Sequence, residues 1–229
     1  MSSLKIALVA EGKTDYVIIE AALKAFLPRT FVLTQLQPED TLPELGTGWG
    51  GVLKWCMMTS SRFQGPISQD PTLDHFDLVI VHVDADVSTF QYQDLGENIS
   101  NLAITKNWGT LPCAKACPPI QDTIVELKRV ILSWLNPASF GSSIICIPAQ
   151  SSGTWLAAAL LPANHNLLRN VECNINVENG LQLLPKASRV KKTKRDYQSK
   201  APLLTNNWAQ VKALCSQAVV FEEHVLGAL

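Results

Sequence analysis

The chain has 229 residues, of which 47% are hydrophobic and 17% are charged, and its formal net charge is −1. This composition excludes a disordered polymer, because the chain can bury a sizeable core. The small net charge excludes a strong overall field, so contact with nucleic acid has to come from a local patch. The apolar stretch at the N-terminus is too short for a signal peptide, and no window approaches the roughly 18 apolar residues of a membrane span. We therefore expect a cytoplasmic protein that does not contact a membrane.

Strands and helices alternate along most of the sequence. The first and third strands are nearly all apolar, which is typical of strands buried on both faces of a sheet that helices cover. In chain order we expect a strand at 4–10, a helix at 13–27, a strand at 31–36, an insertion at 37–75 with a helix near 51–58, a strand at 77–83, a polar and turn-rich segment at 87–118, a helix at 120–135, a strand at 143–148, and helices at 154–161 and 208–226. This order predicts an α/β fold with a mainly parallel sheet.

The six cysteines are spread over most of the chain. Without a secretory signal we expect them to be reduced thiols, several of them in the core. Cys113 and Cys117 have a spacing with which zinc sites often begin, but no second Cys or His pair follows at a suitable distance, so we expect no zinc site. The six are Cys56, Cys113, Cys117, Cys146, Cys173 and Cys215.

Acidic residues follow two of the buried strands. Glu11 comes directly after the first strand, and Asp84 and Asp86 come after the strand at 77–83. In an open parallel sheet, ligands bind beyond the carboxyl ends of the strands, so these side chains should meet if the strands are neighbours. Asp15, four residues after Glu11, lies one turn further along if the helix begins near Lys13. Oxygen ligands of this kind suit Mg²⁺ or Mn²⁺, which we expect as the cofactor.

These residues resemble the motifs of the TOPRIM superfamily. A strand followed by Glu11-Gly12-Lys13-Thr14-Asp15, and a later strand followed by Asp84-Ala85-Asp86, is similar to the pattern of small stand-alone bacterial TOPRIM-like proteins. The nuclease domains of overcoming-lysogenisation-defect proteins are the nearest functional analogue. The resemblance implies that Glu11 acts as metal ligand and general acid or base, and that Asp15, Asp84 and Asp86 bind metal.

Two features depart from that pattern. The interval between Glu11 and Asp84 is long, which implies the insertion at 37–75. The resemblance also implies an acid just before Trp155, where the sequence has Ser152-Gly153-Thr154. We expect a TOPRIM-like core at 1–150 and a helical, basic extension at 151–229 packed on it.

A cluster of cations at 186–200 is the main indication of nucleic-acid binding, and DNA is favoured over RNA. Such a cluster could neutralise several phosphates, although a solvated loop has the same composition. Lys200 is a candidate to stabilise charge in the transition state, and Lys13 could reach a phosphate at the helix N-terminus. The candidate contacts are Lys13, Lys191, Lys192, Lys194 and Arg195. His82 lies within an apolar strand and is interpreted as a hydrogen-bonded core histidine rather than as a ligand.

Three functions remain open from the sequence. The first is a Mg²⁺- or Mn²⁺-dependent phosphodiester hydrolase acting on nucleic acid. The second is a TOPRIM-like binding or scaffold module without activity, which the absent acid before Trp155 favours. The third is a small-molecule phosphotransferase. The resemblance further implies a role in genome maintenance or defence against foreign DNA beside a separate ATPase subunit, but no residue here indicates that partner or the oligomeric state.

Overall fold

The computed structural model describes residues 3–39, 41, 43–186 and 188–229. Its centre is a four-stranded sheet in the order β2-β1-β3-β4, with every neighbouring pair parallel. The strands are β1 (Leu4–Val9), β2 (Phe31–Gln37), β3 (Leu78–His82) and β4 (Ile144–Cys146). The predicted α/β class with a parallel sheet is therefore confirmed, and this layout is consistent with a TOPRIM-like fold.

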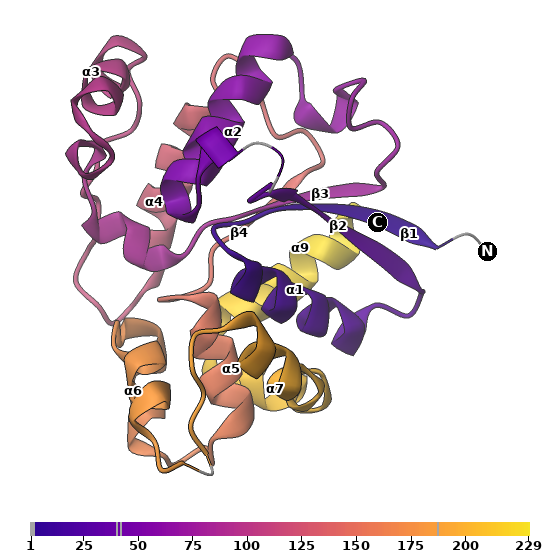
Figure 1. The fold of residues 1–229 in the computed structure, drawn as a ribbon, viewed down its shortest axis with the longest axis vertical. Coiled ribbons are helices and arrows are strands. Elements are labelled where there is room, and N and C mark those ends of the chain that lie inside the picture. Colours follow the sequence, from indigo (N-terminus) through magenta and orange to yellow (C-terminus); the bar gives the residue numbers. More distant parts are fainter. Residues whose placement is uncertain (1–2, 40, 42, 187) are drawn as a thin grey trace.

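Helices cover both faces of the sheet (Figure 1). They are α1 (Lys13–Phe26), α2 (Gly48–Arg62), α3 (Glu97–Thr105), α4 (Gln121–Trp134), α5 (Ser152–Leu160), α6 (Val177–Leu183), α7 (Lys194–Asn206), α8 (Trp208–Leu214) and α9 (Ser216–Ala228). Within the described ranges, none of these helices has the length and apolar character that crossing a membrane requires.

The two faces of the sheet belong to separate cores because side chains alternate along each strand. Ile6 and Leu8 of β1 and Ile80 of β3 point into a core that they share with α1, α5 and α7–α9. Val79 and Val81 point into the opposite core, with α2 and α4. Position 82 falls on the same face as position 80, so β3 directs the residue at its end toward α1 and α5.

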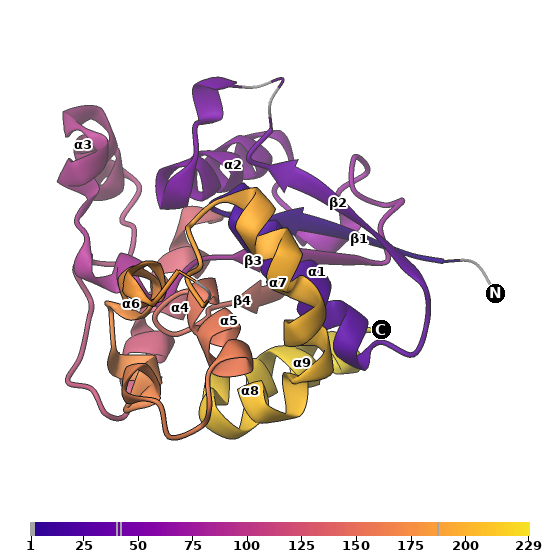
Figure 2. The same cartoon turned by 60° about the horizontal axis from the view of Figure 1, so that its bottom comes forward.

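The C-terminal helices pack on the first of these cores. Figure 2 shows α7 lying along α1, with α8 and α9 beyond it. Trp155 of α5 is fully buried, and its ring lies 5.4 Å from that of Trp208 and 5.5 Å from that of Phe221. Helix α5 also contacts α1, so residues before and after position 150 share one apolar core.

Several helices differ from the expectation, and α6 and α7 lie in the C-terminal extension where no individual helix was predicted. Helix α3 lies in the segment predicted to be only polar and turn-rich, and it begins after Gly96, whose φ of 103° favours glycine. Helix α2 is longer than predicted. The helix expected over 208–226 is broken at Cys215, so that α8 packs on α5 and α9 on β4. Local periodicity could not separate these two helices, because both present apolar residues to the same core.

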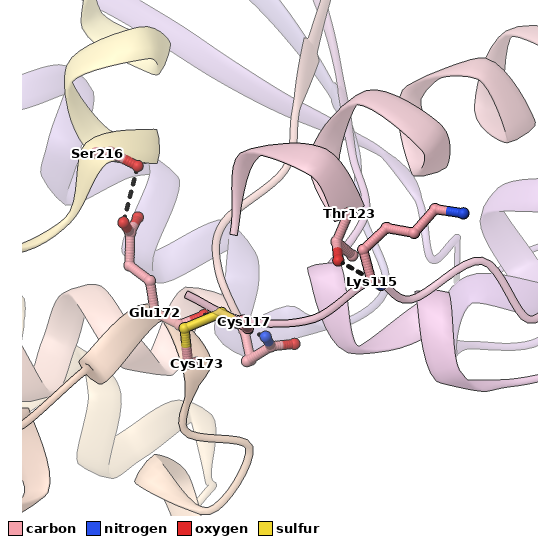
Figure 3. The surroundings of a disulfide bond; sticks show 7 residues. Lys115, Cys117, Thr123, Glu172, Cys173 and Ser216 are labelled. Carbon is pink, nitrogen blue, oxygen red and sulfur yellow. Dashed lines mark hydrogen bonds between the residues drawn. A yellow bond between two sulfur atoms is a disulfide. The ribbon is translucent and has the colours of Figure 1, made fainter. Parts of the chain in front are cut away.

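A disulfide bond joins Cys117 to Cys173 (Figure 3). The interpretation of all six cysteines as reduced thiols is therefore wrong for these two, although Cys56, Cys113, Cys146 and Cys215 are free. The bond connects the segment before α4 to the turn before α6. Beside it, the Glu172 carboxylate accepts hydrogen bonds at 2.7 Å from Ser216 Oγ and at 3.0 Å from the backbone N–H of Gln217, which anchors the start of α9.

Asp70 organises part of the insertion. Its carboxylate accepts hydrogen bonds from Arg62 Nη2 at 2.6 Å and from the backbone N–H and the hydroxyl of Thr72 at 2.9 and 2.8 Å. Burial acts to raise the pKa of Asp70, but these hydrogen bonds outweigh it and the pKa is lowered. The side chain therefore stabilises the fold above its unfolded pKa, and this contribution is lost as the pH falls through the lower pKa of the folded state.

We expect Asp70→Asn to lower the free energy of unfolding by roughly 1–3 kcal/mol at pH 7, because it weakens a buried, charge-assisted network. The difference between the variant and the wild type should shrink below pH 4. Urea unfolding followed by circular dichroism at pH 7 and at pH 3.5 measures it. A difference of the same size at both values of pH would contradict this role of the charge.

Candidate metal centre

The two central strands bring Glu11 and Asp84 together. Strands β1 and β3 are parallel neighbours, so their carboxyl ends lie at the same edge of the sheet. Each acid is the second residue past its strand, and the backbone N–H of Asp84 donates a hydrogen bond of 2.7 Å to Glu11 Oε1. The predicted meeting of these two residues is therefore found in the fold, through a direct contact.

Ser152, at the start of α5, links Asp15 and Asp84. Its hydroxyl donates a hydrogen bond of 2.7 Å to Asp15 Oδ1, and its backbone N–H donates one of 2.9 Å to Asp84 Oδ1. The other oxygen of Asp15, Oδ2, accepts from the backbone N–H of Gly12 at 2.8 Å, as an acid in the first turn of a helix commonly does. Asp15 and Asp84 are both buried, 4% and 6% exposed. Sequence reasoning did not identify Ser152, because it lies 68 residues after Asp84 in the chain.

Asp86 lies at the margin of this group. It is half-buried in the 3₁₀ turn Ala85–Thr89 that follows Asp84. Burial and the charge of Asp84 raise the pKa of Asp86 to about 7, with smaller contributions from Glu178 and Asp15. Asp86 therefore belongs to the same electrostatic cluster, although it stands outside the tight group formed by its neighbours.

Crowded carboxylates make the site favourable for cations. Burial raises the pKa of Glu11 well above its ordinary value, and the charges of Asp84 and Asp15 raise it further. Burial also raises the pKa of Asp84, against the lowering effect of His82. Protons thus reduce the repulsion in the ion-free protein, and a divalent cation at the same place would displace them.

His82 adds a nitrogen to the group. It is fully buried, and its Nε2 lies 3.3 Å from Asp84 Oδ1. Burial acts to lower the pKa of His82, but the charge of Asp15 and the contact with Asp84 outweigh it and the pKa is raised. Among the described residues, ligand atoms of Asp15, His82 and Asp84 all lie within 4.8 Å of one another, as a metal site requires. The sequence carried a signal for this, because residues 82 and 84 are two apart next to a strand end and share a face.

Glu178 of α6 brings a further acid close to the start of α5. Its Oε2 accepts a 2.5 Å ion-pair hydrogen bond from Lys192 Nζ, and its Oε1 accepts a 2.8 Å hydrogen bond from Tyr197 OH. A Cβ added at Gly153 would lie closer than 3.0 Å to this carboxylate, so the glycine leaves the space that Glu178 occupies. The sequence has no acid just before Trp155. In the folded protein, Glu178 from a different segment places a carboxylate beside Gly153, two residues before Trp155.

The predicted cations occupy different positions. Lys192 is held by Glu178, and its charge lowers the pKa of Asp86, so it lies within electrostatic reach of the cluster. Lys191 precedes α7, and Lys194 and Arg195 form its first turn; all three are exposed. Lys200 is partly buried further along α7, and Lys13 is the exposed first residue of α1. The described contacts connect Lys192 to the acids, and the roles of the other cations stay predictions.

We expect Gly153→Ala to lower the free energy of unfolding by roughly 1–3 kcal/mol, because the new methyl group must displace Glu178. Urea unfolding measures this, and Gly227→Ala is the matched control, since a Cβ there meets no atom within 4 Å. In a Glu178→Ala background the cost of Gly153→Ala should largely disappear. An unchanged cost in that background would contradict the close packing of these two residues.

Comparison of the chain with known protein families, with curated proteins and with solved structures found no match.

Proposed function

We propose that this protein is a divalent-metal-dependent phosphodiester hydrolase that acts on nucleic acid, and that it is related to the TOPRIM superfamily. The observation that carries the proposal is the convergence of acids from both central strands and from α1 at one edge of the sheet. Glu11 contacts the backbone of Asp84, and Ser152 bridges Asp84 to Asp15. Carboxylates arranged in this way typically hold Mg²⁺ or Mn²⁺, which activate water and neutralise charge on a phosphoryl group.

In this proposal each acid has a separate role. Asp15 and Asp84 are the buried ligands of the ion, because hydrogen bonds from Ser152 fix both carboxylates. Glu11 is a ligand and the general base, and its raised pKa makes the carboxylate a stronger base than an exposed glutamate. Asp86 completes the site at its half-buried margin, on the side where Lys192 could meet a phosphate.

The position of Glu178 weakens the main reason for an inactive scaffold. That alternative depended on the absence of an acid before Trp155 in the sequence. The carboxylate of Glu178 lies against Gly153, and its charge raises the pKa of both Asp84 and Asp86. The sequence-based argument for an inactive scaffold therefore loses its main support, and we place the hydrolase first.

Plasmid cleavage in the presence of Mn²⁺ tests the proposal. The wild type is expected to nick or linearise supercoiled DNA, and Asp84→Ala/Asp86→Ala to lose roughly 10²–10³-fold or more of that rate, because the ion that stabilises the transition state is no longer held. Asp74→Ala, at an exposed acid, is the control and should cleave as the wild type does. Cleavage that persists in the double variant would point to a contaminant and contradict the mechanism.

A further inference from the structure

We propose that His82 is a metal ligand, so that the buried centre adds one imidazole nitrogen to the carboxylates of Asp15 and Asp84. Such a donor set selects a transition-metal ion of the Mn²⁺ or Co²⁺ type over Mg²⁺. This inference deepens the proposed function and rests on it for the use of the ion, but not for the binding of the ion.

The three donors come from two segments of the fold and meet at one point. Asp15 lies in the first turn of α1, His82 ends β3, and Asp84 follows two residues later. Their ligand atoms lie within 4.8 Å of one another, and His82 Nε2 is 3.3 Å from Asp84 Oδ1. Two adjacent ligands that each stand about 2.1 Å from one ion are about 3.0–3.4 Å apart, so this pair is already at the spacing that coordination requires.

A second observation indicates that His82 is a metal ligand rather than a residue that only stabilises the fold. The side chain is 0% exposed, and among the described residues neither Nδ1 nor Nε2 has a hydrogen-bond partner. Buried polar groups in native proteins are nearly always hydrogen-bonded, because leaving one unpaired is unfavourable. Its Nε2 lies 3.3 Å from Asp84 Oδ1 without the alignment of a hydrogen bond, which is the separation expected of two ligands of one ion.

The nitrogen donor determines which ions the site prefers. Mg²⁺ is bound through oxygen and keeps several waters, whereas imidazole suits transition-metal ions. Oxygen ligands alone, as predicted from the sequence, would accept Mg²⁺ and Mn²⁺ alike. With His82 among the ligands, we expect Mn²⁺ to bind at least about 10-fold more tightly than Mg²⁺.

Pulsed electron paramagnetic resonance of the Mn²⁺-loaded protein tests the inference without any variant. Coordinated imidazole is expected to give ¹⁴N modulation of the Mn²⁺ echo, and growth on ¹⁵N-histidine should replace that modulation with the ¹⁵N pattern. His82→Asn, which offers an amide oxygen at similar volume, should abolish the modulation and reduce the preference for Mn²⁺ over Mg²⁺ measured by calorimetry. His75→Asn, at an exposed histidine, is the matched control and should change neither.

The outcomes separate this inference from the proposed function. Mn²⁺ bound without nitrogen modulation would show that His82 is only an ion-pair partner of Asp84, and would overturn the inference while plasmid cleavage could persist. Nitrogen modulation that shifts with ¹⁵N-histidine but is accompanied by no cleavage would support the ligand and contradict the hydrolase. Absence of Mn²⁺ binding at millimolar concentration would also overturn the inference. Loss of folding in His82→Asn leaves the wild-type spectrum to decide.

Discussion

Asp84→Asn is expected to weaken Mn²⁺ binding by more than roughly 100-fold, since even residues that only support metal ligands change affinity by 10–100-fold. Asparagine can still accept the hydrogen bond from the backbone N–H of Ser152, so the start of α5 should remain in place. The variant removes a charge from a buried group whose pKa is raised, and that charge opposes folding above its pKa. We therefore expect the ion-free variant to be at least as stable as the ion-free wild type.

Calorimetric titration and thermal unfolding with and without Mn²⁺ measure the two effects together. The wild type should be stabilised by about 2.7 kcal/mol when free Mn²⁺ is 100-fold above the dissociation constant, and the variant should not respond. Asp74→Asn makes the same chemical change at an exposed acid and should behave as the wild type does. Retained Mn²⁺ affinity in Asp84→Asn would contradict the role of Asp84 as a metal ligand. A destabilised ion-free variant would show that the charge of Asp84 stabilises the fold.

Loss of the disulfide is the second large effect that we expect. The bond between Cys117 and Cys173 spans 56 residues of sequence, and removing such a bond costs roughly 2–5 kcal/mol because the unfolded chain gains freedom. Replacement of both cysteines by serine should lower the urea midpoint accordingly. The loss should be largest around α6 and the start of α9, because Glu172, next to Cys173, anchors Ser216.

Reduction of the wild type with dithiothreitol should reproduce the effect of the double serine variant. Cys113→Ser, at a partly buried free thiol, is the control and should unfold near the wild-type midpoint. A midpoint that reduction leaves unchanged would contradict a stabilising bond. The cytoplasmic location stays a prediction, and in a reducing compartment the dithiol form is the relevant one, since thiol systems there keep such pairs reduced.

The positions of Glu11, Asp84 and Asp86 after strands could be predicted because the signals are local. A buried strand of a parallel sheet is a continuous apolar run, and the residue that ends the run is visible in the sequence. Rules for open α/β sheets then place such residues at one edge. Helix α3 was not predicted, because its polar composition resembles that of a loop and its apolar side chains gain their stability from packing.

The sequence alone therefore determined the α/β class, the parallel strands and the edge at which their acids lie, because hydrophobic periodicity and strand ends are properties of short segments. The residues that complete the centre are brought together by long-range packing. Ser152 bridges two acids, Glu178 lies against Gly153, and His82 faces Asp84 without a hydrogen bond. The first two contacts join distant segments through the packing of α1, α5 and α6 on the sheet, which sequence spacing does not reveal. The third depends on the orientation of the His82 ring inside the folded protein.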